Sequence, residues 1–232
     1  MKKVFYILIS VLAVVACSSK EDKANKLIKD YMFKHLHDFK SYEAVETKVD
    51  TLYNTPLSDN ECISLANTAY STLENVQEYG EKAERDEQTM DIWSGGWSST
   101  SRKEYTKAYK SWINNKINET TERITYLTAA KELLEKTKNL DGKKQVGWLV
   151  THTFRSNTLG GNSSLGNYIF LMDKDFKSIL ANYDAEDEDI ANALSTISAI
   201  ETNLESPEQV DSSITGWFSL IDRYNEMLEK VK

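Results

Sequence analysis

Two long stretches of helical periodicity, separated by a pair of glycines, constrain the fold of this chain more than any other feature. Before Gly95-Gly96, apolar residues recur at three- and four-residue steps over residues 63–79, and charged, helix-favouring residues continue the stretch. After the glycines, a second pattern of this kind runs over residues 101–139. Helices of these lengths would reach about 45–55 Å. Joined by a short loop, they most simply form an antiparallel hairpin.

The segments that flank this hairpin alternate with a period of two instead. Residues 41–53 place valines and threonines opposite charged residues, and residues 145–155 and 168–172 alternate in a similar way. Residues 176–183 fit either a further strand or the start of a helix. We expect these strands to share one antiparallel sheet, with a loop at 157–167 and with the hairpin inserted between the first strand and the others.

Helical spacing also appears at both ends of the chain. It covers residues 22–39 near the N-terminus, residues 185–204, and a last segment opened by Pro207. The sequence therefore predicts a predominantly helical α+β fold: a long antiparallel helical hairpin inserted in a small antiparallel sheet, with C-terminal helices. No polar linker or internal repeat marks a boundary, so one α+β domain is expected over residues 23–232.

The start of the first long helix carries a capping signal and one cysteine. Ser58 stands three residues before Glu61, which is the spacing of a capping box with Ser58 as the cap. Cys62 follows at once, and its neighbours Asp59 and Glu61 are acidic, which disfavours a reactive thiolate. We expect Cys62 to be a small buried core residue.

The composition excludes several functional classes. Two cysteines cannot form a disulfide framework or a four-cysteine zinc site. The formal net charge of −8 argues against a nucleic-acid partner, because such proteins neutralise phosphates with lysine and arginine. Twelve tyrosines and five tryptophans exclude a disordered acidic chain.

The N-terminus has the organisation of a secretory signal peptide. Lys2 and Lys3 precede an apolar run over residues 4–16, which is too short to span a bilayer as a helix, since that takes about 20 residues. The run ends at Cys17, and polar residues follow immediately. We expect residues 1–16 to be removed, which changes the net charge from −8 to −10 because the two lysines leave with them.

The junction Val14-Val15-Ala16-Cys17 resembles a bacterial lipobox, with Val14 where leucine is usual. The resemblance is to outer-membrane lipoproteins of the Bacteroides type. It covers residues 1–22 and implies acyl chains, palmitate among them, on Cys17, with residues 17–22 as a short tether. Ser18 in place of aspartate implies the outer membrane, and Lys20-Glu21-Asp22 resembles the short signal for export to the cell surface.

Asp50-Thr51-Leu52 resembles the three-residue O-glycosylation signal of secreted proteins of the same type. The resemblance implies a glycan on Thr51. Three residues also match such a signal by chance, so an unmodified Thr51 is the alternative.

Two tryptophans bracket the loop between the long helices. Trp93 and Trp97 flank Ser94-Gly95-Gly96 at the far end of the predicted hairpin. Exposed aromatic rings at such a tip would suit contact with a protein or glycan partner. The alternative is that both rings fold back over the helix ends.

The other polar motifs match no catalytic or metal-binding template. His35 and His37 point to different sides of a helix, and His152 has no metal-binding or catalytic partner in its predicted strand. The acidic run 184–189 lacks the glycine of a calcium loop, and the glycine-rich segment 160–166 lacks the lysine of a phosphate loop. We expect no metal, no cofactor and no catalytic residue among them.

These observations favour a non-enzymatic, membrane-anchored binding or assembly module of the bacterial cell envelope. The alternative is an envelope hydrolase or glycan-processing enzyme whose Asp and Glu residues come from distant parts of the chain. Such an enzyme would need a cleft with two carboxylates about 5–10 Å apart, flanked by Trp148 or His152.

Overall fold

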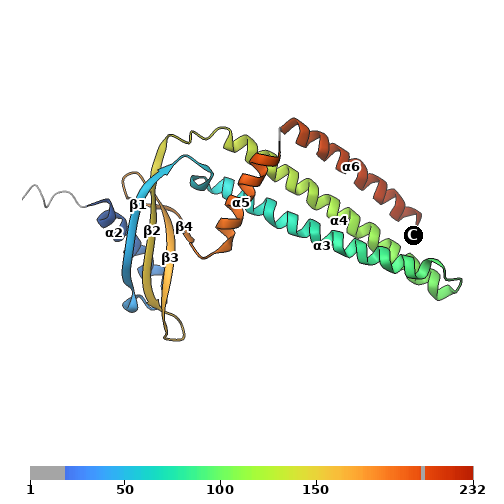
Figure 1. Ribbon diagram of the computed structural model, residues 1–232, viewed down its shortest axis with the longest axis horizontal. Helices are drawn as coiled ribbons and strands as arrows, with labels where there is room; N and C mark the ends of the chain where they lie inside the picture. Colours follow the sequence, from blue (N-terminus) through green and yellow to red (C-terminus); the bar gives the residue numbers. More distant parts are fainter. Residues whose placement is uncertain (1–18, 205–206, 232) are drawn as a thin grey trace, which may run out of the picture. The chain divides into compact units, whose positions relative to one another are not determined.

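The computed structural model describes residues 19–204 and 207–231 (Figure 1). Over this part of the chain it contains five α-helices and one four-stranded antiparallel sheet. The predicted α+β fold is confirmed, and the helical hairpin lies between the first and second strands in sequence. The chain divides into two compact units, a sheet unit formed by residues up to 58 with 141–190 and a helical unit formed by residues 59–140 and 191–232.

The sheet unit contains the four strands in the order in which they occur in the chain. They are β1 (Glu43–Tyr53), β2 (Gln145–Asn157), β3 (Ser163–Asp173) and β4 (Ile179–Asp184), each antiparallel to its neighbour. The strand that the sequence left open at residues 176–183 is β4. Two short 3₁₀ turns, η1 (Phe39–Ser41) and η2 (Pro56–Ser58), lie on either side of β1.

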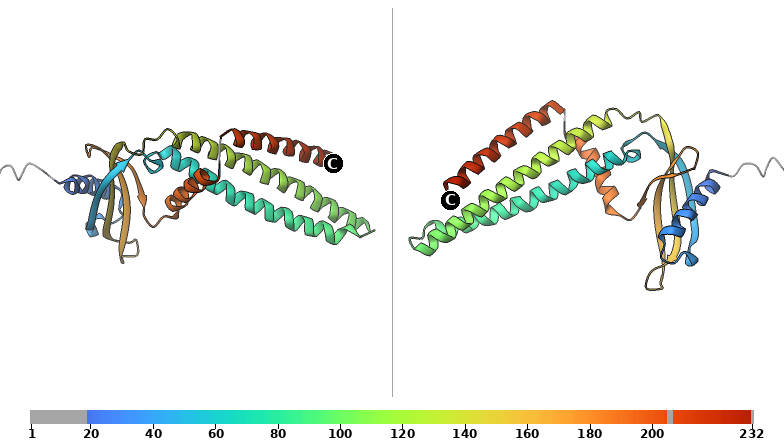
Figure 2. Two further views of the ribbon diagram at one scale, coloured as in Figure 1. Left: turned by 45° about the horizontal axis from the view of Figure 1, so that its top comes forward. Right: turned by 180° about the vertical axis from the view of Figure 1, so that it is seen from behind.

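Helix α2 (Lys20–His35) packs on one face of this sheet, as both views of Figure 2 show. Ala24, Ile28 and Met32 are four residues apart, so they share one side of the helix and are fully buried. They meet the core of the sheet, which consists of alternate residues of the central strands β2 and β3: Val150, Phe154, Phe170 and Met172. The buried side chains of α2, which recur every four residues, therefore pack with the alternate side chains of β2 and β3 to form one apolar layer.

The ends of α2 differ from the prediction of residues 22–39. The helix begins at Lys20 because Ser19 and Asp22 form a capping box: each side chain accepts the backbone N–H of the other residue. It ends at His35, since Leu36 has an extended backbone. His37 therefore lies outside the helix.

The segment predicted as a loop at 157–167 is mostly strand. β2 continues to Asn157 and β3 begins at Ser163. Gly166 lies opposite Phe154, and a Cβ at this glycine would be 2.5 Å from the ring carbon Cζ of Phe154. A glycine that reads as a loop residue in the sequence is thus needed inside the strand to accommodate an aromatic ring.

The helical unit is built on the predicted hairpin of α3 (Asn60–Ser94) and α4 (Ser99–Thr137), which confirms this part of the sequence analysis. It also contains α6 (Pro207–Lys230) and most of α5 (Glu188–Asn203). α6 runs alongside α4, as Figure 2 shows. Lys131 and Asp211 form an ion pair of 2.8 Å, and the rings of Trp112 and Tyr224 meet edge to face.

A buried carboxylate lies in the middle of α4. Glu119 accepts hydrogen bonds from Lys116 and Arg123, and the guanidinium of Arg123 lies 5.5 Å from the ring of Trp217 in α6. Burial acts to raise the pKa of Glu119, but the hydrogen bonds from these two cations outweigh it and hold the pKa below its usual value. Glu119 is therefore an ionised group inside the helical unit.

The cap of α3 is Asp59 and not the predicted Ser58. The Asp59 side chain accepts the backbone N–H groups of Glu61 and Cys62. Ser58 instead closes the preceding turn, because its hydroxyl donates to the carbonyl of Thr55 and accepts the N–H of the same residue. The capping-box interpretation of Ser58 and Glu61 was therefore wrong by one residue.

Candidate functional site at the hairpin tip

The reversal between α3 and α4 is a four-residue turn fixed by its own hydrogen bonds. The N–H of Gly96 donates to the carbonyl of Trp93, and the hydroxyl of Ser98 accepts the N–H of Ser101 to cap α4. A Cβ on Gly96 would meet the Ser101 side chain far inside contact distance, so this position needs glycine. The tip is thus a defined turn that presents its flanking residues in fixed places.

The two predicted tip tryptophans have different environments. Trp97 is 96% exposed and lies at the point of the turn, and Ile92, near the end of α3, is 75% exposed. Trp93 is half-buried and lines a shallow pocket of about 270 Å³ together with Arg102 and Tyr105. The alternative in which the rings fold back over the helix ends therefore fits Trp93 but not Trp97.

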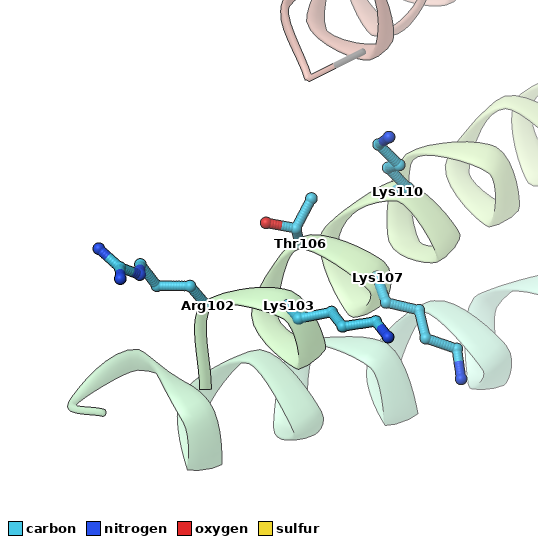
Figure 3. A pocket seen from close by; sticks show the side chains of 5 residues that line it. All are labelled: Arg102, Lys103, Thr106, Lys107 and Lys110. Carbon is cyan, nitrogen blue, oxygen red and sulfur yellow. The ribbon is translucent and has the colours of Figure 1, made fainter. Parts of the chain in front are cut away.

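Basic side chains line the first turns of α4 behind this apex. Arg102, Lys103, Thr106, Lys107 and Lys110 surround an open depression of about 440 Å³ (Figure 3). Lys103 and Lys107 extend to the same side of the helix, as their four-residue spacing requires (Figure 3). Over the described residues, none of these four cations has an acidic partner within ion-pair distance, whereas Lys116, Lys131 and Lys136 each have one.

The sign of the charge at the tip is opposite to that of the whole chain. Between residues 91 and 110 there are four basic and two acidic side chains, whereas the chain carries a net −8. The acidic residues of α3 are concentrated further from the turn, in residues 78–87, where two of them pair with Lys82 and Arg85. The aromatic residues of the tip were predicted from the sequence and the cations were not, although the four basic residues over 102–110 were a usable signal.

The structure places Cys62, which was predicted as a core residue, and Thr51, which was predicted as a site residue, but not Cys17. Cys62 is fully buried, as predicted, and burial together with Asp59 raises the pKa of its thiol to about 11. Thr51 is half-buried on the edge strand β1 opposite Trp148, and its glycosylation stays a prediction. Cys17 lies outside the described residues, so its acylation also stays a prediction.

His152 is fully buried in the sheet unit and holds a chain of hydrogen bonds together. The Thr47 hydroxyl donates to the side-chain oxygen of Asn25 at 2.6 Å, so it accepts from Nδ1–H of His152 at 2.9 Å. Nε2 of His152 then accepts the hydroxyl proton of Tyr42, also at 2.9 Å. Burial lowers the pKa of His152 to about 4, so the ring is neutral and structural.

The hydrolase alternative requires a cleft with two carboxylates beside Trp148 or His152, so the surroundings of Trp148 are relevant to it. The indole N–H donates to the carbonyl of Lys174, the ring stacks on Phe176, and the Lys20 ammonium lies 3.8 Å from the ring centre. A nearby depression of about 360 Å³ includes three aspartates, but Asp22 caps α2 and Asp175 pairs with Lys177. Over the described residues, no three His, Cys, Asp or Glu side chains lie together in a metal-binding arrangement.

The acidic run at 184–189 shapes the start of α5. Asp184 accepts the N–H of Glu186, and Asp187 accepts the N–H of Asp189. Glu188 and Asp189 occupy the first turn of the helix, where negative charge is favourable through the helix dipole.

At the hairpin tip, an exposed apolar ring and four cations that are unpaired within the described chain come together. The tip offers contacts to a partner surface, through one aromatic apex and four basic side chains. Among the described helices, none is both long enough and apolar enough to cross a membrane. Comparison with protein-family models, with curated proteins and with solved structures found no match to this chain.

Proposed function

We propose that this protein is a lipid-anchored lipoprotein of the bacterial outer membrane that acts as a non-enzymatic binding or assembly module. Support for the anchor comes from Lys2-Lys3, the apolar run that follows, and the lipobox-like junction at Cys17. Each buried acyl CH₂ contributes about 0.8 kcal/mol, so several chains on one cysteine suffice for stable attachment. Lys20-Glu21-Asp22 supports an orientation at the cell surface through its resemblance to an export signal.

The exposed hairpin tip is the observation that carries the binding role. Trp97 leaves almost its whole ring in water at the end of two helices of 35 and 39 residues, which corresponds to about 50 Å of reach. A tryptophan exposed at such a point suits contact with a partner, because aromatic side chains are enriched at interfaces. The four neighbouring cations give the segment 91–110 a net charge of +2, opposite in sign to that of the whole chain.

Acylation tests the anchor. Cells that produce the protein are fed an alkyne analogue of palmitate, and the purified protein is examined for label and for intact mass. We expect label in the wild type and in Cys62→Ala, and none in Cys17→Ala. Label that persists in Cys17→Ala would contradict the proposal. A mass equal to the lipidated polypeptide alone would also exclude a glycan on Thr51.

Site-specific photo-crosslinking tests the binding role. A photoreactive amino acid replaces Trp97 in one variant and Leu159 in another, because Leu159 is also strongly exposed but lies between β2 and β3. We expect covalent adducts in living cells from position 97 and none from position 159. The same adducts from both positions, or none from position 97, would remove the support for the tip as a contact site.

A further inference from the structure

The apex of the hairpin has the chemistry of a group that enters a lipid interface. Trp97 exposes a large apolar side chain at the point of the turn, and Ile92 exposes another in the last turn of α3. Tryptophan favours the boundary between hydrocarbon and headgroups, because its ring is apolar and its N–H can remain hydrogen-bonded. An isoleucine beside it adds area that only an apolar environment satisfies.

Two of the four cations, Arg102 and Lys103, follow the apex at depths that match the headgroup layer. In an end-on approach, Arg102 and Lys103 lie about 5–6 Å behind the first residue of α4, and Lys107 lies about 12 Å behind it. The headgroup region of a bilayer is roughly 5–8 Å thick on each side. Lys107 then falls within about one Debye length of the charged surface, and Lys110 lies just beyond it.

The arrangement suits a charged plane better than a single anion or a folded protein. The cations spread over about two turns of α4, and no described acidic side chain pairs with them. Lys103 and Lys107 repel each other at i,i+4 spacing, a cost that a nearby layer of negative charge removes. An acidic protein surface would satisfy the cations, whereas an anionic bilayer satisfies both the cations and the apolar apex.

We propose that the hairpin tip docks onto an anionic lipid surface, with Trp97 and Ile92 in the interface and Arg102, Lys103, Lys107 and Lys110 facing the headgroups. This inference rests on the proposed function insofar as the tip is the contact site. The inference identifies the partner of the tip as a negatively charged membrane. The tip contacts this membrane, and the acyl chains on Cys17 provide a separate attachment.

Fluorescence at the tip tests this proposal directly. Cysteine replaces Ser99, which is exposed beside Trp97, and carries an environment-sensitive dye, while the buried Cys62 does not react. The protein with its anchor is placed in phosphatidylcholine vesicles. In one arm, a second set of vesicles, made of phosphatidylcholine mixed with phosphatidylglycerol, is then added. In the other arm, the protein is placed in vesicles of this anionic mixture from the start. We expect a blue shift and stronger emission with the anionic lipid, both weakened by salt.

Matched variants separate the two contributions. Lys103→Gln with Lys107→Gln should weaken binding about 25-fold, since each cation near an anionic surface contributes about fivefold. Trp97→Ala should weaken it about tenfold or more, because it removes a large apolar side chain from the interface. The controls are Lys26→Gln with Lys34→Gln on α2, which changes the charge equally, and Leu159→Ala, which removes another exposed apolar side chain. Both controls should bind as the wild type does.

Several results would overturn the inference. They are equal binding to pure phosphatidylcholine, no blue shift with anionic vesicles from a protein with native circular dichroism, or equal loss in the tip variants and their controls. Flotation of the protein with the phosphatidylcholine vesicles, carried out before the anionic vesicles are added, tests the anchor alone. A protein that does not float but still binds anionic vesicles overturns the anchor alone. A protein that floats without binding them overturns the tip inference alone, even where position 97 crosslinks to a protein.

Discussion

Among the described residues, each unit buries one histidine or carboxylate side chain, and one of these two side chains is neutral while the other is ionised. His152 in the sheet unit is neutral, with its pKa lowered to about 4 by burial. Glu119 in the helical unit is ionised, with its pKa below the usual value. Burial opposes charge in both places, so the difference comes from their partners.

His152 has only neutral partners. Tyr42 and Thr47 provide one hydroxyl for each ring nitrogen, which satisfies a neutral imidazole and offers nothing to a charged one. Glu119 has two cationic donors, Lys116 and Arg123, on the adjacent turns of its own helix. The comparison shows that two cationic donors about one helical turn away reverse the effect of burial on Glu119, whereas the two neutral hydroxyl partners of His152 do not.

Acidification should produce the largest difference in stability between the sheet unit and the helical unit. In the unfolded chain His152 becomes protonated below pH 6.5, whereas in the folded sheet unit it becomes protonated only at about pH 4. The contribution of His152 is therefore complete above pH 6.5 and is lost as the pH falls to about 4, by roughly 3 kcal/mol in free energy of unfolding. Glu119 should lose its contribution only below pH 4.5. Amide exchange of β2 and of α4 at a series of pH values measures both.

Two observations would contradict the predicted difference in acid sensitivity between His152 and Glu119. One is equal loss of protection in β2 and α4 between pH 6.5 and 4.5. The other is an NMR titration of His152 with a midpoint near the value for the unfolded chain. The variant His152→Gln should show a flatter pH dependence, because it removes the titrating ring.

Removing the carboxylate of Glu119 should have the next largest effect. Glu119→Ala leaves Lys116 and Arg123 without their acceptor, and we expect a loss of about 2 kcal/mol in denaturant unfolding. This is below the roughly 3–5 kcal/mol of a fully buried pair, because both cations can reach water. Glu132→Ala, an exposed change on the same helix, should be neutral within about 0.5 kcal/mol. Similar losses in both variants would mean that the network around Glu119 contributes nothing special.

Removing one hydroxyl beside His152 should cost somewhat less. Tyr42→Phe leaves the buried Nε2 of His152 without its donor, which we expect to lower the free energy of unfolding by about 1–2 kcal/mol. Tyr53→Phe removes a hydroxyl from an exposed side chain and is the matched control. Indistinguishable stabilities of these two variants would show that the hydrogen bond to His152 is dispensable.

The smallest effect is expected when only the geometry of the donor at Glu119 changes. Arg123→Lys keeps the charge but loses the two N–H bonds to Oε1 and the planar group over Trp217. We expect a loss of about 0.5–1 kcal/mol by chemical denaturation, with Arg85→Lys, at an exposed ion pair, as the control. A loss as large as that of Glu119→Ala would instead show that the arginine geometry carries the whole network.

Much of the fold can be predicted from the sequence because its signals are local. The hairpin follows from helical spacing around Gly95-Gly96, and the strands follow from alternation. The alternation fails at Val45, where a shift in register between Ala44 and Glu46 leaves this valine half exposed. No pattern along the chain shows such a bulge, since it depends on the pairing with β2.

The candidate site is predictable only in part, for a related reason. Trp93 and Trp97 stand out because they flank a turn, but an unpaired cation looks the same in sequence as a paired one. Whether Lys107 or Lys116 has a carboxylate partner depends on the side chains nearby in the folded helix. The partners of His152 are likewise out of reach, because Tyr42 and Thr47 precede it by 110 and 105 residues.

The length of the hairpin has a mechanical consequence. A helix of 35 residues extends about 52 Å, so a tilt of roughly 6° about its base displaces the tip by about 5 Å, one full helical turn. The arm thus amplifies small changes in packing near Cys62 and the last turn of α4. One spin label at the tip of the hairpin and a second on the sheet unit would report such a tilt as a change in the distance between them.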